Sequence, residues 1–575
     1  MLVLATVPHG RVSYYLASLG DEDGGARLEA GGVWLGSGAA QLGLAGTAVG
    51  AADLAAVLAG RSPSDGESLF GRPDRRRVAA YDCTFSCPKS VSVLALVAPE
   101  PLASAARAAH DAAVASAISY LERQAGAVRR VESGRPERRR SGIIAATVQH
   151  CASRSADPHL HTHALVANLG RDGAGSWSAL DGRPLFVERA AAAALYESEL
   201  RRRLARDLGV VFHLSESGVL DLVGIPASLR REFSQRTRQI AAEMAAHGHH
   251  SARAARVAAL ITRAPKDPSA TLQDLAARWQ LRTRERGIPD ARWARVAPGR
   301  DVGVPPPDDS VLLRFEEPFA RRDLLRLLAT EAHDGELISA LEARADRLLR
   351  LPEVRPLSGD ASPSREADAG PDAFAAGIRY TTPAIEALSR RVETVLADAI
   401  AHRGETEIVA GQLIVAAEAT AGALAPALRS ARRAGRSVRV AASDGETARR
   451  LGAAFGVPGF STASAATAVQ RSIVVIPGAE SLPLESLAEI AEAARRGSGA
   501  LVLLISTARS GRTARSRTRL RALARQSSER LGPQGWDIAH WRGPEAERHG
   551  GIGDEPWRER PAEIRELSLG RSLFR

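Results

Sequence analysis

The segment D-P-H-L-H-T-H-A-L-V-A-N-L, residues 157–169, constrains the fold of this chain more than any other stretch. Its run L-H-T-H-A-L-V-A-N at 160–168 is bounded by turn residues and predicts a β-strand. Because successive side chains of a strand point to opposite faces, we expect His159, His161 and His163 on the same face. The chain has only 14 histidines in 575 residues, so three at alternate positions are a marked concentration. The segment therefore predicts a strand with imidazoles on one side.

Imidazole nitrogen is a common ligand of divalent metal ions, and two histidines two residues apart on a strand can share an ion. The third ligand would be His159 of the same strand, or His150 at the end of the strand-like run I-I-A-A-T-V-Q-H. Periodicity alone does not choose between these two histidines. For an H-x-H pair by itself, a histidine-rich surface strand without a metal is an equally good interpretation.

Length and charge limit the class of protein. A chain of 575 residues is too long for one hydrophobic core, and domains of about 100–200 residues predict two to four units. The net charge of +11 and the pI near 10.3 favour an acidic partner such as nucleic acid over a neutral metabolite. Lys89 and Lys266 are the only lysines, so nearly all of the positive charge is arginine.

Cysteine usage and the first residues bear on the cellular compartment. Cys83, Cys87 and Cys151 are too few for a disulfide framework and match no Cys-x-x-Cys zinc spacing, so we interpret them as reduced thiols. The start M-L-V-L-A-T-V-P lacks the basic region and long apolar run of a signal peptide, and no segment has about 18 uninterrupted apolar residues. These features predict a soluble, cytoplasmic protein.

Residues 1–300 are expected to form an α+β domain with a central antiparallel sheet, ended by the proline-rich break V-G-V-P-P-P-D-D-S. Apolar runs bounded by turn residues predict its strands, and apolar residues at helical spacing predict its helices. The strands are expected at 2–7, 90–97, 143–150 and 160–168, and the helices at 103–124 and 189–208.

The remaining residues divide by pattern into three parts. Residues 301–379 are predicted to hold a helical segment at 321–351 and a polar, flexible linker at 357–372. Helices that alternate with apolar strands predict an α/β domain with a parallel, RecA-like sheet at 380–530. Its strands are expected at 407–410, 437–442, 472–476 and 500–506, with a helix at 421–434. Residues 531–575 are predicted to form a C-terminal tail.

Two further motifs contain candidate site residues. In Y-D-C-T-F-S-C-P-K-S-V-S-V-L, Asp82 begins an apolar strand, where a carboxylate is costly unless it has a partner. A hydrogen bond from the free ring nitrogen of a metal-bound histidine would be such a partner. In R-V-S-Y-Y-L, Tyr14 and Tyr15 are adjacent. Adjacent tyrosines are most often packing residues, but a phenol with a pKa of about 10 can attack a phosphate if a base or a cation removes its proton.

Taken together, S-Y-Y, D-C-T-F-S-C-P-K-S-V-S and H-C-A-S-R-S-A-D-P-H-L-H-T-H-A-L-V-A-N resemble the MobF class of conjugative relaxases, the TrwC/TraI type of HUH endonuclease. The similarity continues through G-S-W-S-A-L-D at 175–181 and T-R-A-P-K-D at 262–267, and so covers about the first 290 residues. Three ordered motifs at family-like spacing are far more specific than any one of them.

The resemblance implies an enzyme that nicks and rejoins one DNA strand at the transfer origin of a plasmid or conjugative element. A tyrosine would attack the scissile phosphate and leave a 5′-phosphotyrosyl link and a free 3′-hydroxyl. The implied nucleophile is Tyr14, with Tyr15 as the alternative, and Asp82 would orient a metal histidine and assist removal of the tyrosine proton.

The resemblance also implies a divalent metal ion, magnesium or manganese or another transition metal, held by His150, His161 and His163. His159 would then be a bystander. The implied partners are single-stranded DNA at the transfer origin, a type IV coupling protein, accessory relaxosome proteins and a separate helicase.

One departure from the family concerns a second tyrosine pair. Many members carry such a pair shortly after the first, whereas no tyrosine lies between Tyr15 and Tyr81 here. A second cleavage would have to use Tyr15 or another molecule.

Two basic stretches are candidates for contact with DNA phosphates. Residues 129–140 hold six arginines and two glutamates, and residues 508–525 hold seven arginines and no acidic residue. A solvated turn and a disordered tail are the respective alternatives.

In this class a RecA-like helicase usually follows the relaxase, and Y-T-T-P-A-I-E-A-L-S-R-R-V at 380–392 resembles its entry. A working phosphate loop needs G-x-x-x-x-G-K-[ST]. The segment at 416–425, A-A-E-A-T-A-G-A-L-A, lacks that pattern, and no lysine follows Lys266. Pro477 and Gly478 stand where a magnesium-binding aspartate and its neighbour would follow the strand. We therefore predict a degenerate helicase domain that binds no ATP and serves in DNA binding or docking.

Two other functions remain as alternatives. A catalytically impaired relaxase remnant could act as a DNA-binding protein, and an HUH-type replication initiator or transposase could use the same chemistry. The D-x-T-F-S-x-P-K-S stretch argues against an initiator or transposase. The intact set of tyrosine, aspartate and histidines argues against decay of the first domain.

Overall fold

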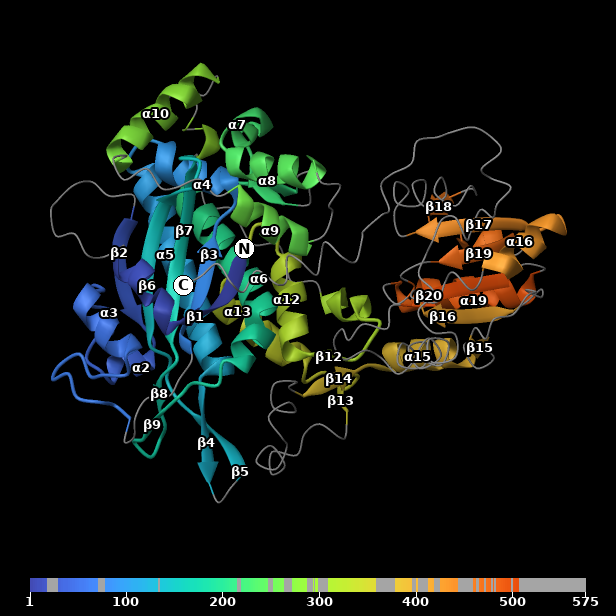
Figure 1. Cartoon of the computed structure of the whole chain (residues 1–575), viewed down its shortest axis with the longest axis horizontal. Coiled ribbons are helices and arrows are strands. Elements are labelled where there is room, and N and C mark those ends of the chain that lie inside the picture. Colours follow the sequence, from blue (N-terminus) through green and yellow to red (C-terminus); the bar gives the residue numbers. More distant parts are fainter. Residues whose placement is uncertain are drawn as a thin grey trace. The chain divides into compact units, whose positions relative to one another are not determined.

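The structure is a computed structural model of the chain. It describes residues 1–17, 29–70, 78–132, 135–214, 219–246, 252–262, 271–286, 293, 295–297, 309–357, 378–395, 400–401, 412–417, 425–442, 459–461, 465–469, 472–476, 479, 482–497 and 500–505. These residues fall into two compact units, which we describe separately (Figure 1). Unit 1 holds the described residues of Met1–Leu312 and Phe319–Tyr380. Unit 2 holds Leu313–Pro318 and the described residues from Thr381 onward.

A five-stranded sheet forms the centre of unit 1 (Figure 1). Every neighbouring pair of its strands is antiparallel, which confirms the central antiparallel sheet expected from the sequence. In spatial order the strands are β1 (Leu2–Pro8), β3 (Val78–Ser86), β7 (Pro158–Ala167), β6 (Ala145–Ala152) and β2 (Glu29–Leu35).

The two faces of this sheet are covered by different helices. The long helices α5 (Leu102–Ala125) and α6 (Arg183–Leu208) pack on each other and contact one face through buried side chains. On the other face, buried residues of α3 (Ala51–Leu58) join the sheet in an apolar cluster, and α1 (Val12–Ala17) packs against it. Helix α6 is followed by Gly209, which caps it in a left-handed conformation with φ of 67° that glycine accepts without strain.

The expected strand at 90–97 is wrong, because these residues form helix α4 (Lys89–Val97). All residues from Ser90 to Val97 are buried. An apolar run that is buried on every side has no polar face to reveal its period, so a buried helix and a buried strand look alike in the sequence. The hydroxyl of Ser90 donates to Asp221 and that of Ser92 accepts from the amide of Leu160, so both buried serines are satisfied.

Residues 129–140 form most of a hairpin rather than a loop. Its strands are β4 (Ala127–Glu132) and β5 (Arg135–Arg140), paired antiparallel.

The other elements of unit 1 before residue 315 are short strands and peripheral helices. They are η1 (His9–Arg11), α2 (Ser37–Ala40), β8 (Gly170–Arg171), β9 (Trp177–Ser178), β10 (Phe212–Leu214), β11 (Leu220–Leu222), α7 (Ala227–Glu232), α8 (Gln235–Ala246), α9 (Ala252–Ile261), α10 (Leu272–Glu285) and η2 (Asp309–Arg314), whose last residues belong to unit 2.

Helices α12 (Arg321–Glu331) and α13 (Ile338–Leu348) pack on α6 and α5 within unit 1. The buried side chain of Arg201 in α6 donates to the carbonyls of Ala329 and Ala332, at 2.9 and 3.0 Å, at the C-terminal end of α12. A cation there satisfies carbonyls that have no partner inside the helix. Near these helices lie the short strands β12 (Phe319–Ala320), β13 (Arg355–Pro356) and β14 (Arg379–Thr381).

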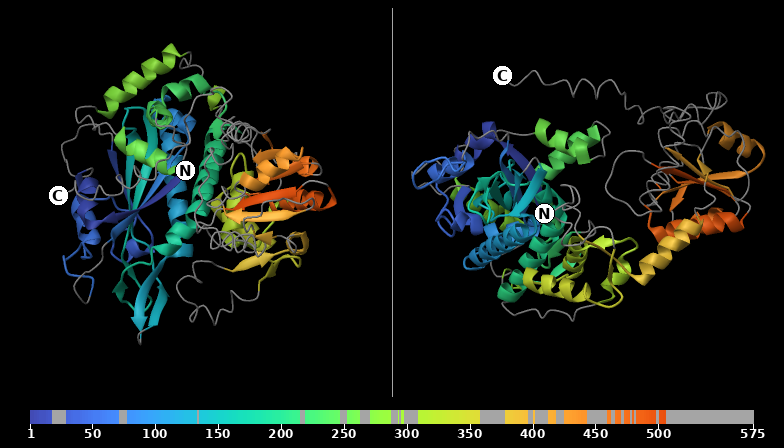
Figure 2. Two further views of the ribbon diagram at one scale, coloured as in Figure 1. Left: turned by 45° about the vertical axis from the view of Figure 1, so that its right-hand side comes forward. Right: turned by 90° about the horizontal axis from the view of Figure 1, so that it is seen from below.

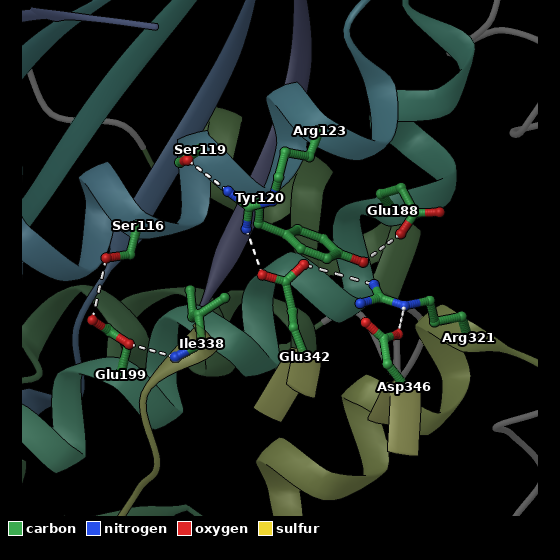
Figure 3. Close-up of polar contacts among 10 residues, drawn as sticks. All are labelled: Ser116, Ser119, Tyr120, Arg123, Glu188, Glu199, Arg321, Ile338, Glu342 and Asp346. Atoms are coloured by element: carbon green, nitrogen blue, oxygen red, sulfur yellow. Dashed lines mark hydrogen bonds and ion pairs between the residues drawn. The ribbon is translucent and has the colours of Figure 1, made fainter. Parts of the chain in front are cut away.

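A polar cluster ties the same helices together (Figure 3). Glu199 of α6 accepts from the amide of Ile338 at 2.6 Å, and Glu342 of α13 pairs with Arg123 of α5. Tyr120 of α5 donates to Glu188 of α6 at 2.6 Å. The sequence placed these helices in a segment between two domains, whereas their contacts join them to α5 and α6. The domain boundaries themselves stay a prediction.

Unit 2 contains a parallel sheet, as the sequence predicts, flanked by helices (Figure 2). Its strands in spatial order are β15 (Ile400–Ala401), β16 (Leu413–Ala417), β20 (Ala500–Ile505), β19 (Ser472–Ile476), β17 (Ser437–Ala442) and β18 (Gly459–Ser461). Its helices are α15 (Pro383–Val395), α16 (Ala425–Arg433), α18 (Ala465–Val469) and α19 (Leu484–Arg496).

Several sequence-based expectations lie outside the described residues. These are the strand at 407–410, nearly all of the linker at 357–372, the residues 418–424, Pro477 and Gly478, the basic stretch at 508–525 and the tail at 531–575. Among the described residues, no helix is long and apolar enough to cross a membrane.

The turn between α12 and α13 supplies a test of their docking on α6. Gly335 has a φ of +78°, and a Cβ atom there would lie 2.2 Å from the carbonyl oxygen of Ser198 and 2.4 Å from the amide nitrogen of Arg202. Gly335→Ala should therefore lower the free energy of unfolding by about 1–3 kcal/mol more than backbone strain alone would. Gly66→Ala is the matched control, because Gly66 has a φ of +74° and nothing within 4 Å of its Cβ position. Urea denaturation measures the free energy of unfolding of both variants. If both lose the same amount relative to wild type, this docking is contradicted.

Candidate metal and tyrosine site

Three histidines meet on one face of the unit 1 sheet. His150 of β6 lies directly opposite His161 of β7, and His163 follows His161 by two residues, so all three side chains point to the same side. Their ligand nitrogens lie within 4.8 Å of one another. Within the described part of the chain, no other group of histidine, cysteine, aspartate or glutamate side chains has such a spacing.

His159 lies beside this group and is not part of it. Its ring stacks on that of His161, with centroids 4.6 Å apart and an interplanar angle of 26°. Burial, and the charge of His161 next, hold the pKa of His159 well below its usual value. The carbonyl of His159 lies 2.9 Å from Nδ1 of His161. If Nδ1 donates there, Nε2 of His161 keeps its lone pair for a metal.

His163 has an acidic partner on the neighbouring strand. Its Nδ1 lies 3.0 and 2.9 Å from the two carboxylate oxygens of Asp82. A carboxylate accepts only, so Nδ1 donates and the lone pair of the His163 ring lies on Nε2. Asp82 is buried, and this contact supplies the partner that its position in an apolar strand requires.

The tyrosine pair lies at the same end of the sheet. The hydroxyl of Tyr15 donates to Oδ2 of Asp82 at 2.8 Å, and its ring meets that of His163 edge-on, with centroids 5.9 Å apart. Tyr14 precedes it in α1, and the position of its side chain lies outside the described residues. The structure thus brings Tyr15, Asp82 and the three histidines together, and their catalytic and ligand roles stay predictions.

Two residues of this region were missed from the sequence. Thr84 lies two residues after Asp82 on β3, and its Oγ1 is 3.1 Å from both Oδ1 of Asp82 and Nδ1 of His163. The spacing D-x-T in a strand would have placed it on the face of Asp82. His110 of α5 is fully buried behind the sheet, and nothing in its helical surroundings sets it apart in the sequence.

His110 holds β7 from behind. Its Nε2 and Nδ1 lie 2.8 Å from the hydroxyls of Thr162 and Tyr196, so it links β7 to α6 midway between two of the clustered histidines. Burial, and the charge of His161 next, lower the pKa of His110 to about 3. The ring is therefore neutral at physiological pH, as a fully buried imidazole without an acidic partner must be.

The three-histidine group suits a divalent metal ion by its chemistry. Nitrogen ligands at about 2.0–2.1 Å from a shared ion lie roughly 3–4 Å apart, so modest ring movement would close the observed 4.8 Å. For two of the three rings, a hydrogen-bond acceptor at Nδ1 favours the tautomer with hydrogen on Nδ1, which has its lone pair on Nε2. The donor set and its surroundings therefore fit a metal.

The arginines of the β4–β5 hairpin are partly neutralised by buried carboxylates. Arg138 pairs with Asp181, and Arg130 pairs with Asp172 at 2.9 Å. Hydrogen bonds, first from the amide of Ser176 and then from Arg130, lower the pKa of Asp172. The side chain of Arg129 is 51% exposed and lies 3.9 Å from Asp181. Pairing with Asp181 and Asp172 thus reduces the net positive charge of this region below what residues 129–140 carry by themselves. Its contact with phosphates stays a prediction.

Comparison with known proteins gives concordant matches over the first half of the chain. The family model of TrwC relaxase matches residues 5–286. Two proteins called multifunctional conjugation protein TraI, one from Escherichia coli and one from its strain K12, are 33% and 32% identical over 250 residues. That stretch covers 40% of this chain and only 13% of the length of each TraI protein.

Solved structures also match. Two structures of the conjugative relaxase TrwC in complex with oriT DNA, one metal-free and one metal-bound, are 31% and 30% identical to this chain. Each match covers 50% of this chain and 100% of the other, with a TM-score of 0.45.

Proposed function

Since residues 5–286 of this chain belong to the TrwC relaxase family, we propose that the chain nicks one DNA strand at a transfer origin and rejoins it. One observation carries this proposal. Tyr15, Asp82 and His163, which come from three separate sequence motifs, are joined by hydrogen bonds on one face of the sheet. His150 and His161 complete the group. The TraI relatives, which are called conjugation proteins, support the same class of reaction.

In the proposed reaction, a tyrosine oxygen of α1 attacks the scissile phosphorus and the 3′-oxygen leaves. The phenol loses its proton to a base and the leaving oxygen gains one, so the products are a 5′-phosphotyrosine and a 3′-hydroxyl. We assign the attack to Tyr14, with Tyr15 as the alternative. Asp82 accepts a hydrogen bond from the phenol of Tyr15, so its carboxylate is within reach of a proton from this helix. Attack of the 3′-hydroxyl on the phosphotyrosine reverses these changes and reseals the strand.

We assign a divalent metal ion, magnesium or manganese or another transition metal, to His150, His161 and His163. When bound, such an ion supplies positive charge that stabilises the phosphate as charge builds up on it. The residues of the chain orient the ligands: Asp82 and the carbonyl of His159 fix the rings of His163 and His161. Three neutral imidazoles leave the full charge of the ion available to the phosphate.

For unit 2 we propose a degenerate RecA-like helicase domain that docks or binds DNA and does not hydrolyse ATP. The parallel order of its strands is consistent with this ancestry. The chain has no lysine after Lys266, so no lysine is available to contact the phosphates of a nucleotide in this unit.

The nucleophile can be tested with a single-stranded oligonucleotide that carries the cognate transfer origin, in the presence of Mn²⁺. We expect wild-type protein to form a covalent protein–DNA adduct, visible as a shifted band under denaturing conditions. Tyr14→Phe should abolish the adduct because it removes the attacking oxygen. Tyr380→Phe is the matched control and should leave it unchanged.

The other outcomes of this experiment are informative. An adduct that persists in Tyr14→Phe and disappears in Tyr15→Phe would move the attack to Tyr15. If wild-type protein binds cognate DNA and forms no adduct, the chain is a DNA-binding remnant of a relaxase.

The ligand assignment predicts different effects on the nicking rate when His159 and His163 are replaced. His163→Ala should lower the nicking rate at least about 100-fold, because it removes a ligand and leaves Asp82 without its partner. His159→Gln should change the rate by less than about threefold, since His159 contributes its backbone carbonyl and not its ring. Single-turnover nicking of labelled origin DNA measures both. A loss in His159→Gln as large as that in His163→Ala would contradict the assignment.

The proposal for unit 2 predicts no ATP turnover by the full chain, with or without single-stranded DNA, because the lysine of a phosphate loop is missing. Phosphate release measures this, and a RecA-like helicase of known activity is the positive control. DNA-stimulated hydrolysis by wild-type protein would overturn the proposal.

A further inference from the structure

We propose that Thr84 is a positioning residue of the histidine site. Its hydroxyl would hold the carboxylate of Asp82 against the ring of His163, so that Nε2 of His163 faces the other two histidines. This inference rests on the proposed function, since it takes His163 to be a metal ligand. It goes beyond that function because it assigns a role to a residue outside the ligand and tyrosine sets.

The register of the sheet brings these three residues together. Thr84 lies directly opposite His163 in the β3–β7 pair, and Asp82 precedes it by two residues on the same face. Oγ1 of Thr84 is 3.1 Å from Oδ1 of Asp82 and 3.1 Å from Nδ1 of His163. The distance from Nδ1 to Oδ1 is 3.0 Å. The hydroxyl oxygen, the carboxylate oxygen and the ring nitrogen thus form a nearly equilateral triangle.

Counting hydrogens assigns the donors in this triangle. An ionised carboxylate only accepts, and a threonine hydroxyl has one hydrogen, which is donated here to Oδ1 of Asp82. The lone pairs of Oγ1 and both oxygens of Asp82 then surround Nδ1 of His163, so Nδ1 carries the ring hydrogen. The neutral ring with hydrogen on Nδ1 has its lone pair on Nε2, which is the form that binds a metal through Nε2.

Two hydroxyls hold the carboxylate of Asp82, one on each oxygen. Thr84 donates to Oδ1, and Tyr15 donates to Oδ2 at 2.8 Å. With both oxygens held, the carboxylate has little freedom to rotate away from His163. Without Thr84, Oδ1 would lose this hydroxyl donor, and the ring of His163 would lose one of the two groups that favour its metal-binding tautomer.

The change Thr84→Val removes the hydroxyl and keeps the branched shape of the side chain. We expect it to weaken Mn²⁺ binding to the full-length protein about tenfold, at the lower end of the usual range for partners of metal ligands. Thr84→Ser keeps the hydroxyl and should bind Mn²⁺ within about twofold of wild type. Calorimetric titration of Mn²⁺ without DNA measures this affinity independently of nicking.

Thr147→Val is the matched control. Thr147 lies in β6 of the same sheet, and its hydroxyl bonds the backbone of Val33 at 2.8 Å. It faces away from His163, since it lies opposite Ala164 in the β6–β7 pair. This variant loses a threonine hydroxyl from the same sheet and should keep wild-type affinity for Mn²⁺.

A second measurement follows the tautomer itself. The ring nitrogens of ¹⁵N-histidine report which of them carries hydrogen, and the signals of His163 are assigned by their loss in His163→Gln. At pH 8 without metal, we expect hydrogen on Nδ1 in wild type and Thr84→Ser, and a mixture of tautomers in Thr84→Val.

The two measurements distinguish failure of this inference from failure of the metal site. If wild type binds Mn²⁺, and Thr84→Val binds it equally well with hydrogen still on Nδ1, the role of Thr84 is overturned and the metal site stands. If wild type binds no divalent ion, the metal assignment fails. The tautomer of His163 is then the only measurement that tests the positioning role of Thr84. A tautomer that changes in Thr84→Val and not in Thr84→Ser then supports its positioning role, and an unchanged one overturns it.

Discussion

The pairing register of β3, β7 and β6 is the constraint on which the candidate site depends. It places Asp82 and Thr84 beside His163, and His150 beside His161. A slip of one residue in either pair would turn every side chain of a strand to the opposite face. The histidines of β7 would then face the helix-covered core, and Leu160 and Thr162, which lie between them, would face the site. The energetic cost of that exchange fixes the register, and the register fixes the site.

Both faces of the sheet contribute to holding this register. On the site face, the histidines of β7 are followed along the strand by Leu165 and Ala167, which pack in the apolar cluster with α3. On the helix face, His110 bonds Thr162 between the clustered histidines. Strand β7 is thus fixed by apolar packing at one end and by a buried hydrogen-bonded histidine behind the site. Rigid support of this kind keeps the histidine side chains in place through contacts within the chain.

Particular elements show how far sequence reasoning reached. Strand β7 and the strands β17, β19 and β20 of unit 2 were predicted correctly because each is a short run bounded by turn residues. The strands β15, β16 and β18 were not predicted, and the strand expected at 407–410 lies outside the described residues. Helix α4 was mistaken for a strand because it is buried on every side, so its sequence shows no helical spacing of polar and apolar residues. The docking of α12 and α13 on α6 depends on Arg201 and Glu199, which in the sequence look like ordinary charges of an exposed helix face.

The sequence by itself determined the family, the antiparallel core and the residue types available for chemistry, because ordered motifs and strand periodicity are local properties. Spacing by itself left open which histidines cluster, since His159 and His150 were equally good third members, and only the family resemblance implied His150. The tertiary structure brings His150 beside His161 and His163, and it alone showed that Thr84 contacts both Asp82 and His163. The physical reason is that these contacts join different strands, and a cross-strand register is set by the packing of the whole sheet and not by any one segment.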